Sequence, residues 1–284
     1  MANEKTSFSE PSHKFEGKGK IIGIISIKGG VGKTSSVSNL GAVLASEFNK
    51  RVLVIDANFT APNLALHLGL IEPKITIHDV LLNRAHINEA IHQHEAGFHL
   101  IPGAYVSKKV NPYALKHKIG YLKDSYDIIL IDSSPNLNDE LLATMIASNE
   151  LLVVTTPDFP TLSTTLRAVR LAKQRKTPIV GLILNRVRNK KFELSIKDVE
   201  EAAQVPVLSI LPEDIKVPES ISKTTPVVLY KPKADSSVEY KKLAACLIGE
   251  RYKDTRLLSR LKSIFKKDLT KNNINRLLIE SERR

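Results

Sequence analysis

The sequence has a single cysteine, Cys246, and no apolar run of the ~18–20 residues that a membrane-spanning helix needs. One thiol excludes a disulfide framework and any metal site built from cysteines of one chain. The first 20 residues are polar and lack the apolar stretch of a signal peptide, so we expect a flexible leader at 1–20 and a cytoplasmic protein. With 284 residues, 42% of them hydrophobic, the chain is long enough to bury a core of its own, which excludes a disordered polymer.

Acidic residues are too few to balance the basic ones, and the net charge is +12. Residues 251–284 contain eleven Lys and Arg against four Asp and Glu, so an excess of seven positive charges lies in this tail. A basic tail is typical of proteins that bind anionic surfaces, either lipid head groups or nucleic acid. The alternative is a terminal helix whose charges are simply solvated.

Short apolar runs alternate with segments of helical spacing between residues 21 and 250. Most of the runs lack polar alternation, which is typical of strands buried on both faces of a parallel sheet. The pattern predicts an α/β fold with a doubly wound, mostly parallel sheet of about seven or eight strands and helices on both faces. Ligands of such a sheet bind at the carboxyl ends of its strands. The expected strands are 21–27, 51–56, 98–102, 127–132, 151–156, 178–185 and 206–211, and the expected helices are 33–48, 138–147, 161–173, 195–203 and 236–249.

The segment KGGVGKT, residues 28–34, joins the first apolar run to the first helical segment, as a phosphate-binding loop does. Its glycines allow backbone N–H groups to point at phosphate oxygens, and the following helix directs its positive end at them. We expect Lys33 to reach the β- and γ-phosphates and the Thr34 hydroxyl to bind Mg²⁺. The expected nucleotide contacts in this loop are Lys28, Gly29, Gly30, Val31, Gly32, Lys33, Thr34 and Ser35.

The loop resembles the deviant Walker A motif, KGGxGK[ST], of the MinD/ParA family of P-loop ATPases, with Ile27 where the standard motif has its first glycine. The resemblance covers about residues 20–250. It implies that Lys28 reaches across a dimer interface to the nucleotide of a second subunit, so that dimerisation depends on ATP. It also implies ATP or ADP and Mg²⁺ as cofactors, and partner-stimulated hydrolysis of ATP to ADP and phosphate.

Two aspartates, each at the end of an apolar run, complete the expected site. Asp132 ends DIILID, a Walker B pattern that delivers a carboxylate to Mg²⁺, and Asp56 is expected beside it as a second ligand. The family usually has Asp-x-Asp at the first of these places, but here the second residue is Asn58. An amide cannot accept a proton from water, so we expect slow hydrolysis unless Asp56 shares that role. The resemblance thus implies the catalytic residues Lys28, Asp56, Asn58 and Asp132.

Two further positions match the part of the family pattern that holds adenine. Asn185 ends the run 178–185, and Pro212 and Glu213 follow the last run. A side-chain amide suits the edge of adenine because it offers a donor and an acceptor. The alternative is that Asn185 only caps the end of its strand.

The basic tail has helical periodicity at residues 255–268. Arranged at ~100° per residue, its apolar side chains share one face about 120° wide, and Lys and Arg surround them. This is the signature of a helix lying in a membrane interface, and it resembles the C-terminal membrane-targeting helix of MinD proteins. Alternatively, this helix could pack on the chain itself or on a partner, or bind nucleic acid. The expected membrane-contacting residues are Leu257, Leu258, Leu261, Ile264 and Phe265.

Taken together, these patterns predict an ATP-dependent homodimer that acts as a spatial organiser. It would move between the cytoplasm and an anionic membrane, acting with an unidentified activator or cargo protein. A ParA-type ATPase that binds nucleic acid nonspecifically through basic residues is the alternative. A binding module with an inactive ATP site is another, because of Asn58. An iron–sulfur carrier on the same fold would need a pair of cysteines, which this chain lacks.

Overall fold

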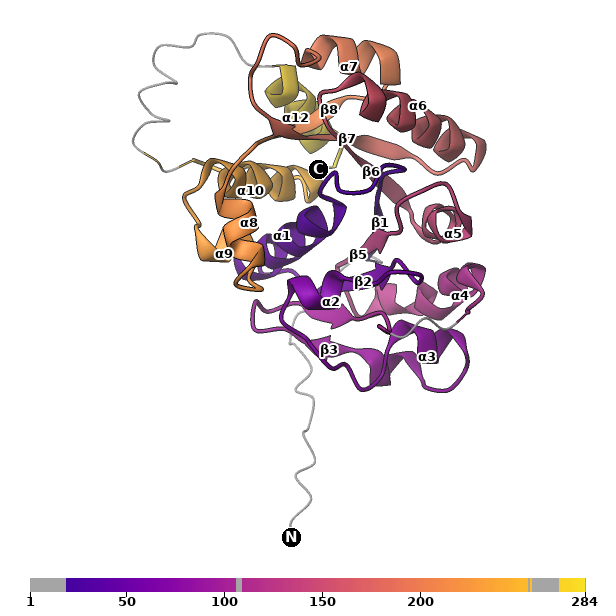
Figure 1. The fold of residues 1–284 in the computed structure, drawn as a ribbon. Coiled ribbons are helices and arrows are strands. Elements are labelled where there is room, and N and C mark those ends of the chain that lie inside the picture. The colour runs from indigo at the N-terminus through magenta and orange to yellow at the C-terminus, as the bar shows by residue number, and fades with distance from the viewer. Residues whose placement is uncertain (1–18, 106–108, 255, 257–270, 284) are drawn as a thin grey trace.

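The computed structural model describes residues 19–105, 109–254, 256 and 271–283 (Figure 1). In these ranges one sheet has the strand order β3-β4-β2-β5-β1-β6-β7-β8, and its pairs are parallel apart from β3 with β4. The expected doubly wound α/β sheet is confirmed. The strands are β1 (Lys20–Ile25), β2 (Val52–Ala57), β3 (His92–Gln93), β4 (His99–Ile101), β5 (Ile128–Ser133), β6 (Glu150–Thr155), β7 (Ile179–Val187) and β8 (Val207–Pro212).

Helices cover both faces of the sheet (Figure 1). One apolar cluster joins the sheet to α1 (Lys33–Ser46), α2 (Leu64–His67), α9 (Val227–Tyr230) and α10 (Asp235–Leu247). On the other face, two clusters join it to α3 (Ile77–Leu81), α4 (Leu115–Ile119), α5 (Asp139–Ala147), α6 (Phe159–Gln174) and α7 (Ile196–Ala203). The short helix α8 (Lys216–Ile221) and the 3-10 turns Ile87–Ala90, Pro112–Ala114 and Gly120–Asp124 lie between these elements.

The first strand shows why the runs are apolar without interruption. Ile22 and Ile24 pack into the cluster under α1, whereas Ile21 and Ile25 pack into clusters on the opposite face. All four side chains are buried. A strand covered by helices on both sides gains free energy from apolar residues at every position, so alternation disappears.

The strand order brings the ends of three strands together. β5 lies between β1 and β2, and Asp56 of β2 is the register partner of Asp132 of β5. In a parallel sheet the carboxyl ends lie at one edge, so the loops that follow β1, β2 and β5 meet there. These loops carry the glycine-rich segment and both expected aspartates.

The last helix, α12 (Lys271–Glu282), packs against α10 and the edge strand β8 with its polar face. Asn272, Arg276 and Glu280 are buried at helical spacing. Arg276 donates from Nε to the carbonyl of Leu208 and from Nη2 to Glu239 Oε2 at 2.6 Å. This part of the basic region 251–284 therefore packs on the α/β fold. Its outward face is apolar, with Ile274, Leu277 and Leu278 exposed by 43%, 37% and 58%.

Candidate nucleotide-binding site

The glycine-rich loop needs its glycines for two physical reasons. Gly30 and Gly32 have φ of 73° and 100°, in the left-handed region that side chains disfavour. A Cβ on Gly32 would also lie 2.3 Å from Nδ2 of Asn185, the amide that donates to the carbonyl of Val31 at 2.7 Å. Helix α1 starts directly after this turn, at Lys33. The loop thus has the shape that the sequence predicts for a phosphate cradle.

Three of the expected site residues come together behind this loop. The hydroxyl of Thr34 donates to Asp132 Oδ2 at 2.6 Å and lies 3.2 Å from Oδ1 of Asn63. Lys33 is only 7% exposed, and desolvation lowers the pKa of its amine while the Asp132 charge acts in the opposite direction. A buried ammonium gains from an anionic ligand, because phosphate charge would replace the solvation that burial removes.

Asp56 is completely buried and holds the backbone that follows β2. Its Oδ1 accepts from the N–H of Asn58, and its Oδ2 accepts from the N–H groups of Asn63 and Leu64, all at 3.0 Å. Burial raises the pKa of the Asp56 carboxyl, and the neighbouring Asp132 raises it further. The carboxylate therefore fixes loop 57–63, beside the place where we expect it to contribute to a metal site.

The residues present fit the expected Mg²⁺. Oδ1 of Asp132 is buried and has no hydrogen-bond partner among the described residues. Burial raises the pKa of this carboxyl, although the Thr34 hydroxyl and Lys33 oppose the rise. A free carboxylate oxygen beside a hydroxyl is the hard oxygen donor set that Mg²⁺ prefers. A dication there would compensate a buried negative charge that now lacks full solvation.

The buried carboxyls predict a pH-dependent effect of Mg²⁺ on stability. The pKa values of Asp56 and Asp132 are raised above the ordinary 3.8, so without metal the native chain holds protons that the unfolded chain has lost. The two protonated carboxyls contribute fully to the free energy of unfolding below pH 3.8, the ordinary pKa. This contribution is lost as the pH rises through the raised pKa values of the folded chain. Because Mg²⁺ displaces these protons, we expect it to stabilise the chain more at about pH 9 than at about pH 6.

Denaturant titrations with and without Mg²⁺ at both pH values measure this difference. Asp132→Asn is the control, because it removes the free carboxylate oxygen and should remove most of the Mg²⁺ effect. A stabilisation by Mg²⁺ that is independent of pH, or that survives in Asp132→Asn, contradicts this site.

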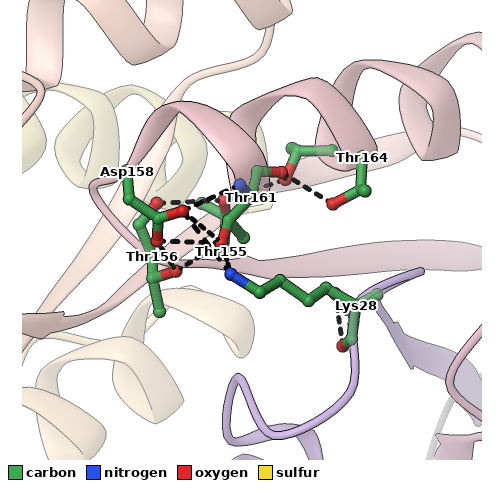
Figure 2. A network of polar contacts seen from close by, with 8 residues as sticks. Lys28, Thr155, Thr156, Asp158, Thr161 and Thr164 are labelled. Atoms are coloured by element: carbon green, nitrogen blue, oxygen red, sulfur yellow. Dashed lines mark hydrogen bonds and ion pairs between the residues drawn. The ribbon is translucent and has the colours of Figure 1, made fainter.

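Lys28 extends towards the start of α6 (Figure 2). Its Nζ donates to Oγ1 of Thr161 at 2.6 Å and lies 3.5 Å from Oδ1 of Asp158. The same Asp158 oxygen accepts from the N–H of Thr161 at 2.9 Å and so caps the helix. The Lys28 and Asp158 side chains are 42% and 43% exposed, and an ion pair this open to solvent contributes little free energy. The ion pair with Asp158 therefore does little to hold Lys28 in this position.

The amide of Asn58 closes its own loop. Nδ2 donates to the carbonyl of Ala61 at 2.5 Å. In this arrangement the side chain stabilises the turn that ends at Asn63, whose Oδ1 lies 3.2 Å from the Thr34 hydroxyl. A role of Asn58 beside the attacking water stays a prediction.

The residues expected to hold adenine lie at the ends of the neighbouring strands β7 and β8. Asn185 supports the phosphate loop by donating from its side-chain amide to Val31, and its side-chain Oδ1 accepts from the N–H of Arg186 at 2.9 Å. Glu213 pairs with Arg188, at 2.8 Å from Nη2 to Oε1. Pro212 and Glu213 line a cavity of about 330 Å³ together with Asp214, Lys216, Lys233, Ala234 and Asp235. Contact of these residues with adenine stays a prediction.

Sequence reasoning did not find the partners of Lys28. Asp158 and Thr161 belong to the sequence DFPT, in which an Asp cap followed by proline in the first turn is a signal for a helix start. That signal predicts where α6 begins, but it does not show that β1 and β6 are neighbours. The adjacency that joins Lys28 to Asp158 is visible only in the strand order.

Comparisons with known proteins agree with this geometry. A family model described as an AAA domain matches residues 19–179. An uncharacterised ATP-binding protein of Methanocaldococcus jannaschii is 34% identical over 81% of this chain and 88% of its own length. The septum site-determining protein MinD of Synechocystis is 32% identical over 81% of this chain and 90% of its own. The structure of MinD complexed with Mg-ADP from Pyrococcus horikoshii has a TM-score of 0.76 at 32% identity, covering 88% of this chain and 99% of that one. The chain therefore belongs to the MinD/ParA family of P-loop ATPases.

Proposed function

We propose that this chain binds Mg-ATP at the glycine-rich loop and hydrolyses it slowly. The observation that carries the proposal is the free, buried oxygen of Asp132 beside the Thr34 hydroxyl and the Lys33 amine. Mg-ADP in the relative from Pyrococcus horikoshii supports this nucleotide. Bound Mg²⁺ would supply charge neutralisation of the phosphates at Thr34 and Asp132.

The chain's own residues would hold the phosphates and order the water. Lys33 places its buried amine at the loop, and Asp56 fixes loop 57–63 so that Asn63 lies beside Thr34. Asn58 offers an amide where the family usually has a carboxylate, so proton removal from the attacking water is weak. We therefore propose turnover below the ~1–100 s⁻¹ typical of kinases, with stimulation by a partner protein.

We further propose that ATP drives formation of a homodimer. The Lys28 amine lies in a solvent-exposed pair that costs little to break. If the Lys28 side chain moved to the phosphates of a second copy, it would exchange the weak ion pair with Asp158 for strong, charge-assisted hydrogen bonds to phosphate. ATP would thus control the number of membrane-binding segments in one assembly.

The anchor that we propose lies in the segment containing Leu257, Leu258, Leu261, Ile264 and Phe265, which is outside the described residues. The chain on either side of it is fixed to the fold. Arg256 pairs with Asp235 and with Asp254, and Lys271 pairs with Glu200 at 2.8 Å. The part of the chain that the structure describes has no helix long and apolar enough to cross a bilayer. We propose reversible binding of this segment to anionic lipid, as part of a spatial organiser that is cytoplasmic when released from the membrane.

Lipid binding is expected to depend on ATP, on anionic lipid and on Phe265. Basic residues close to an anionic surface contribute about 1 kcal/mol each, so salt should weaken binding. Two segments in one dimer bind with an avidity about 10²–10⁴-fold above one segment. Sedimentation with anionic liposomes in ATP and in ADP should show more binding in ATP, and Phe265→Glu should abolish it.

Phe192→Glu is the matched control, because Phe192 is 75% exposed and lies outside the segment. If Phe265→Glu binds as the native chain does, the segment is not the anchor. If neither the native chain nor Phe192→Glu binds liposomes while both sediment with DNA, the nucleic-acid function replaces the membrane function.

A further inference from the structure

Glu140 is a buried carboxylate that none of the roles described above uses. It lies in the first turn of α5 and is 8% exposed. Thr60 donates its hydroxyl to Oε1 at 2.5 Å, and Oε2 is buried without a hydrogen-bond partner among the described residues. A buried carboxylate is costly unless hydrogen bonds stabilise it. The hydrogen bond from the Thr60 hydroxyl therefore stabilises the buried Glu140 carboxylate.

Thr60 stands in the loop that reaches the nucleotide site. Loop 57–63 carries Asn58 and Asn63, and both its ends are bound to the carboxylate of Asp56. Its middle is held from α3, because Nε2 of the buried His78 lies 2.9 Å from the carbonyl of Phe59. Nδ1 of His78 accepts from the N–H of Ala104, so Nε2 carries the proton and donates to that carbonyl.

Glu140 holds the same loop from α5, the helix that follows β5 and its Asp132. Asn138 caps this helix by accepting from the N–H of Leu141 at 3.0 Å, and it also accepts from the hydroxyl of Ser134 at 2.9 Å. Ser134 comes two residues after Asp132. The Thr60–Glu140 hydrogen bond therefore joins the loop after β2 to the segment after β5, on the two neighbouring strands that carry the site aspartates.

We propose that Glu140 is a positioning residue for hydrolysis, acting through Thr60 on loop 57–63. The inference rests on the proposed ATPase activity. Asn58 and Asn63 reach the site on a short loop, and displacement of such groups by about 1 Å can cost a factor of 10² in rate. The contact would act on turnover and leave ATP affinity intact, because Lys33, Thr34 and the glycine turn lie outside the loop.

The test compares Thr60→Val with Thr60→Ser. Valine keeps the shape and loses the hydroxyl, whereas serine keeps the donor. We expect Thr60→Val to lower kcat about tenfold or more, the range for loss of a hydrogen bond to a charged group, with the ATP dissociation constant unchanged within about twofold. Thr60→Ser should stay close to the native rate. Glu140→Gln should lower kcat in the same direction, and Asp139→Asn, which removes a neighbouring charge that contacts Tyr113 instead, should have no effect.

A double variant separates positioning from loss of folding. Thr60→Val with Glu140→Met makes both partners apolar, so no buried carboxylate is left unpaired. Its kcat should match the slower single variant, because both changes remove one contact. A native rate in Thr60→Val, or rate losses that multiply in the double variant, overturns the proposal.

Hydrogen exchange of the amides in residues 57–63 gives a measurement that does not depend on catalysis. Faster exchange is expected in Thr60→Val, and native exchange in Thr60→Ser and Asp139→Asn. Unchanged exchange in Thr60→Val overturns the positioning role of Glu140. Absence of ATP hydrolysis in the native chain would instead overturn the proposed function, so the two failures are distinguishable.

Discussion

Replacement of Lys33 by alanine is expected to weaken ATP binding by at least about 100-fold, the loss typical of removing one partner of a buried charge pair. The side chain is buried at the start of α1, where the pKa of its amine is already lowered by desolvation. The phosphates would lose the one buried lysine that the structure describes at this loop. In the same variant the Asp132 carboxyl would lose a neighbouring charge that lowers its pKa.

Isothermal titration with ATP in Mg²⁺ measures this loss. Lys197→Ala is a suitable control, because Lys197 lies on α7 and pairs with Glu201 at an exposed site. A thermal melt of each variant shows whether folding is preserved. Native ATP affinity in Lys33→Ala would mean that residues 28–34 are not a phosphate loop.

The strands of this fold are readable in the sequence because they are buried on both faces. Continuous apolar runs such as Ile21–Ile25 leave little ambiguity between a parallel strand and a surface element. β3 is different, since it consists of His92 and Gln93 alone and pairs antiparallel with β4. Two residues carry no periodicity, and the pairing depends on the turn before β4 rather than on the strand itself.

The site was predictable where a single segment determines its own geometry. Lys33 and Thr34 follow the glycine turn directly, so the helix start places both side chains. The contact of Thr34 with Asp132 spans 98 positions, yet it follows from the rule that carboxyl ends of parallel strands meet at one edge. The contact between Thr60 and Glu140 follows no such rule, because it depends on the path of an irregular loop.

Helix α12 shows why periodicity can mislead about which face is buried. Ile274, Leu277 and Leu278 form the apolar side and would be expected to pack inwards. The opposite side packs instead, because Asn275 and Arg276 donate to the backbone carbonyls of Val207 and Leu208 in the edge strand β8. An edge strand offers unpaired backbone acceptors, and satisfying them stabilises this orientation.

Replacement of Lys28 by alanine is expected to preserve ATP binding to the monomer and to abolish ATP-dependent dimerisation with most of the hydrolysis. In the single chain the amine of Lys28 is bound to Thr161 and lies near Asp158, so its loss removes a contact away from Lys33 and Thr34. The charge would be missing at the phosphates of the second copy, where it is expected to stabilise the transition state.

Light scattering after size exclusion, with ATP and with ADP, measures the dimer. Asp158→Asn is the informative control, because asparagine also caps helices and so preserves the start of α6 while removing the charge beside Lys28. With Lys28 intact, this variant should still dimerise in ATP. An ATP-dependent dimer that persists in Lys28→Ala would show that the subunits associate without this lysine. Loss of dimerisation in Asp158→Asn alone would place the essential charge on α6 instead.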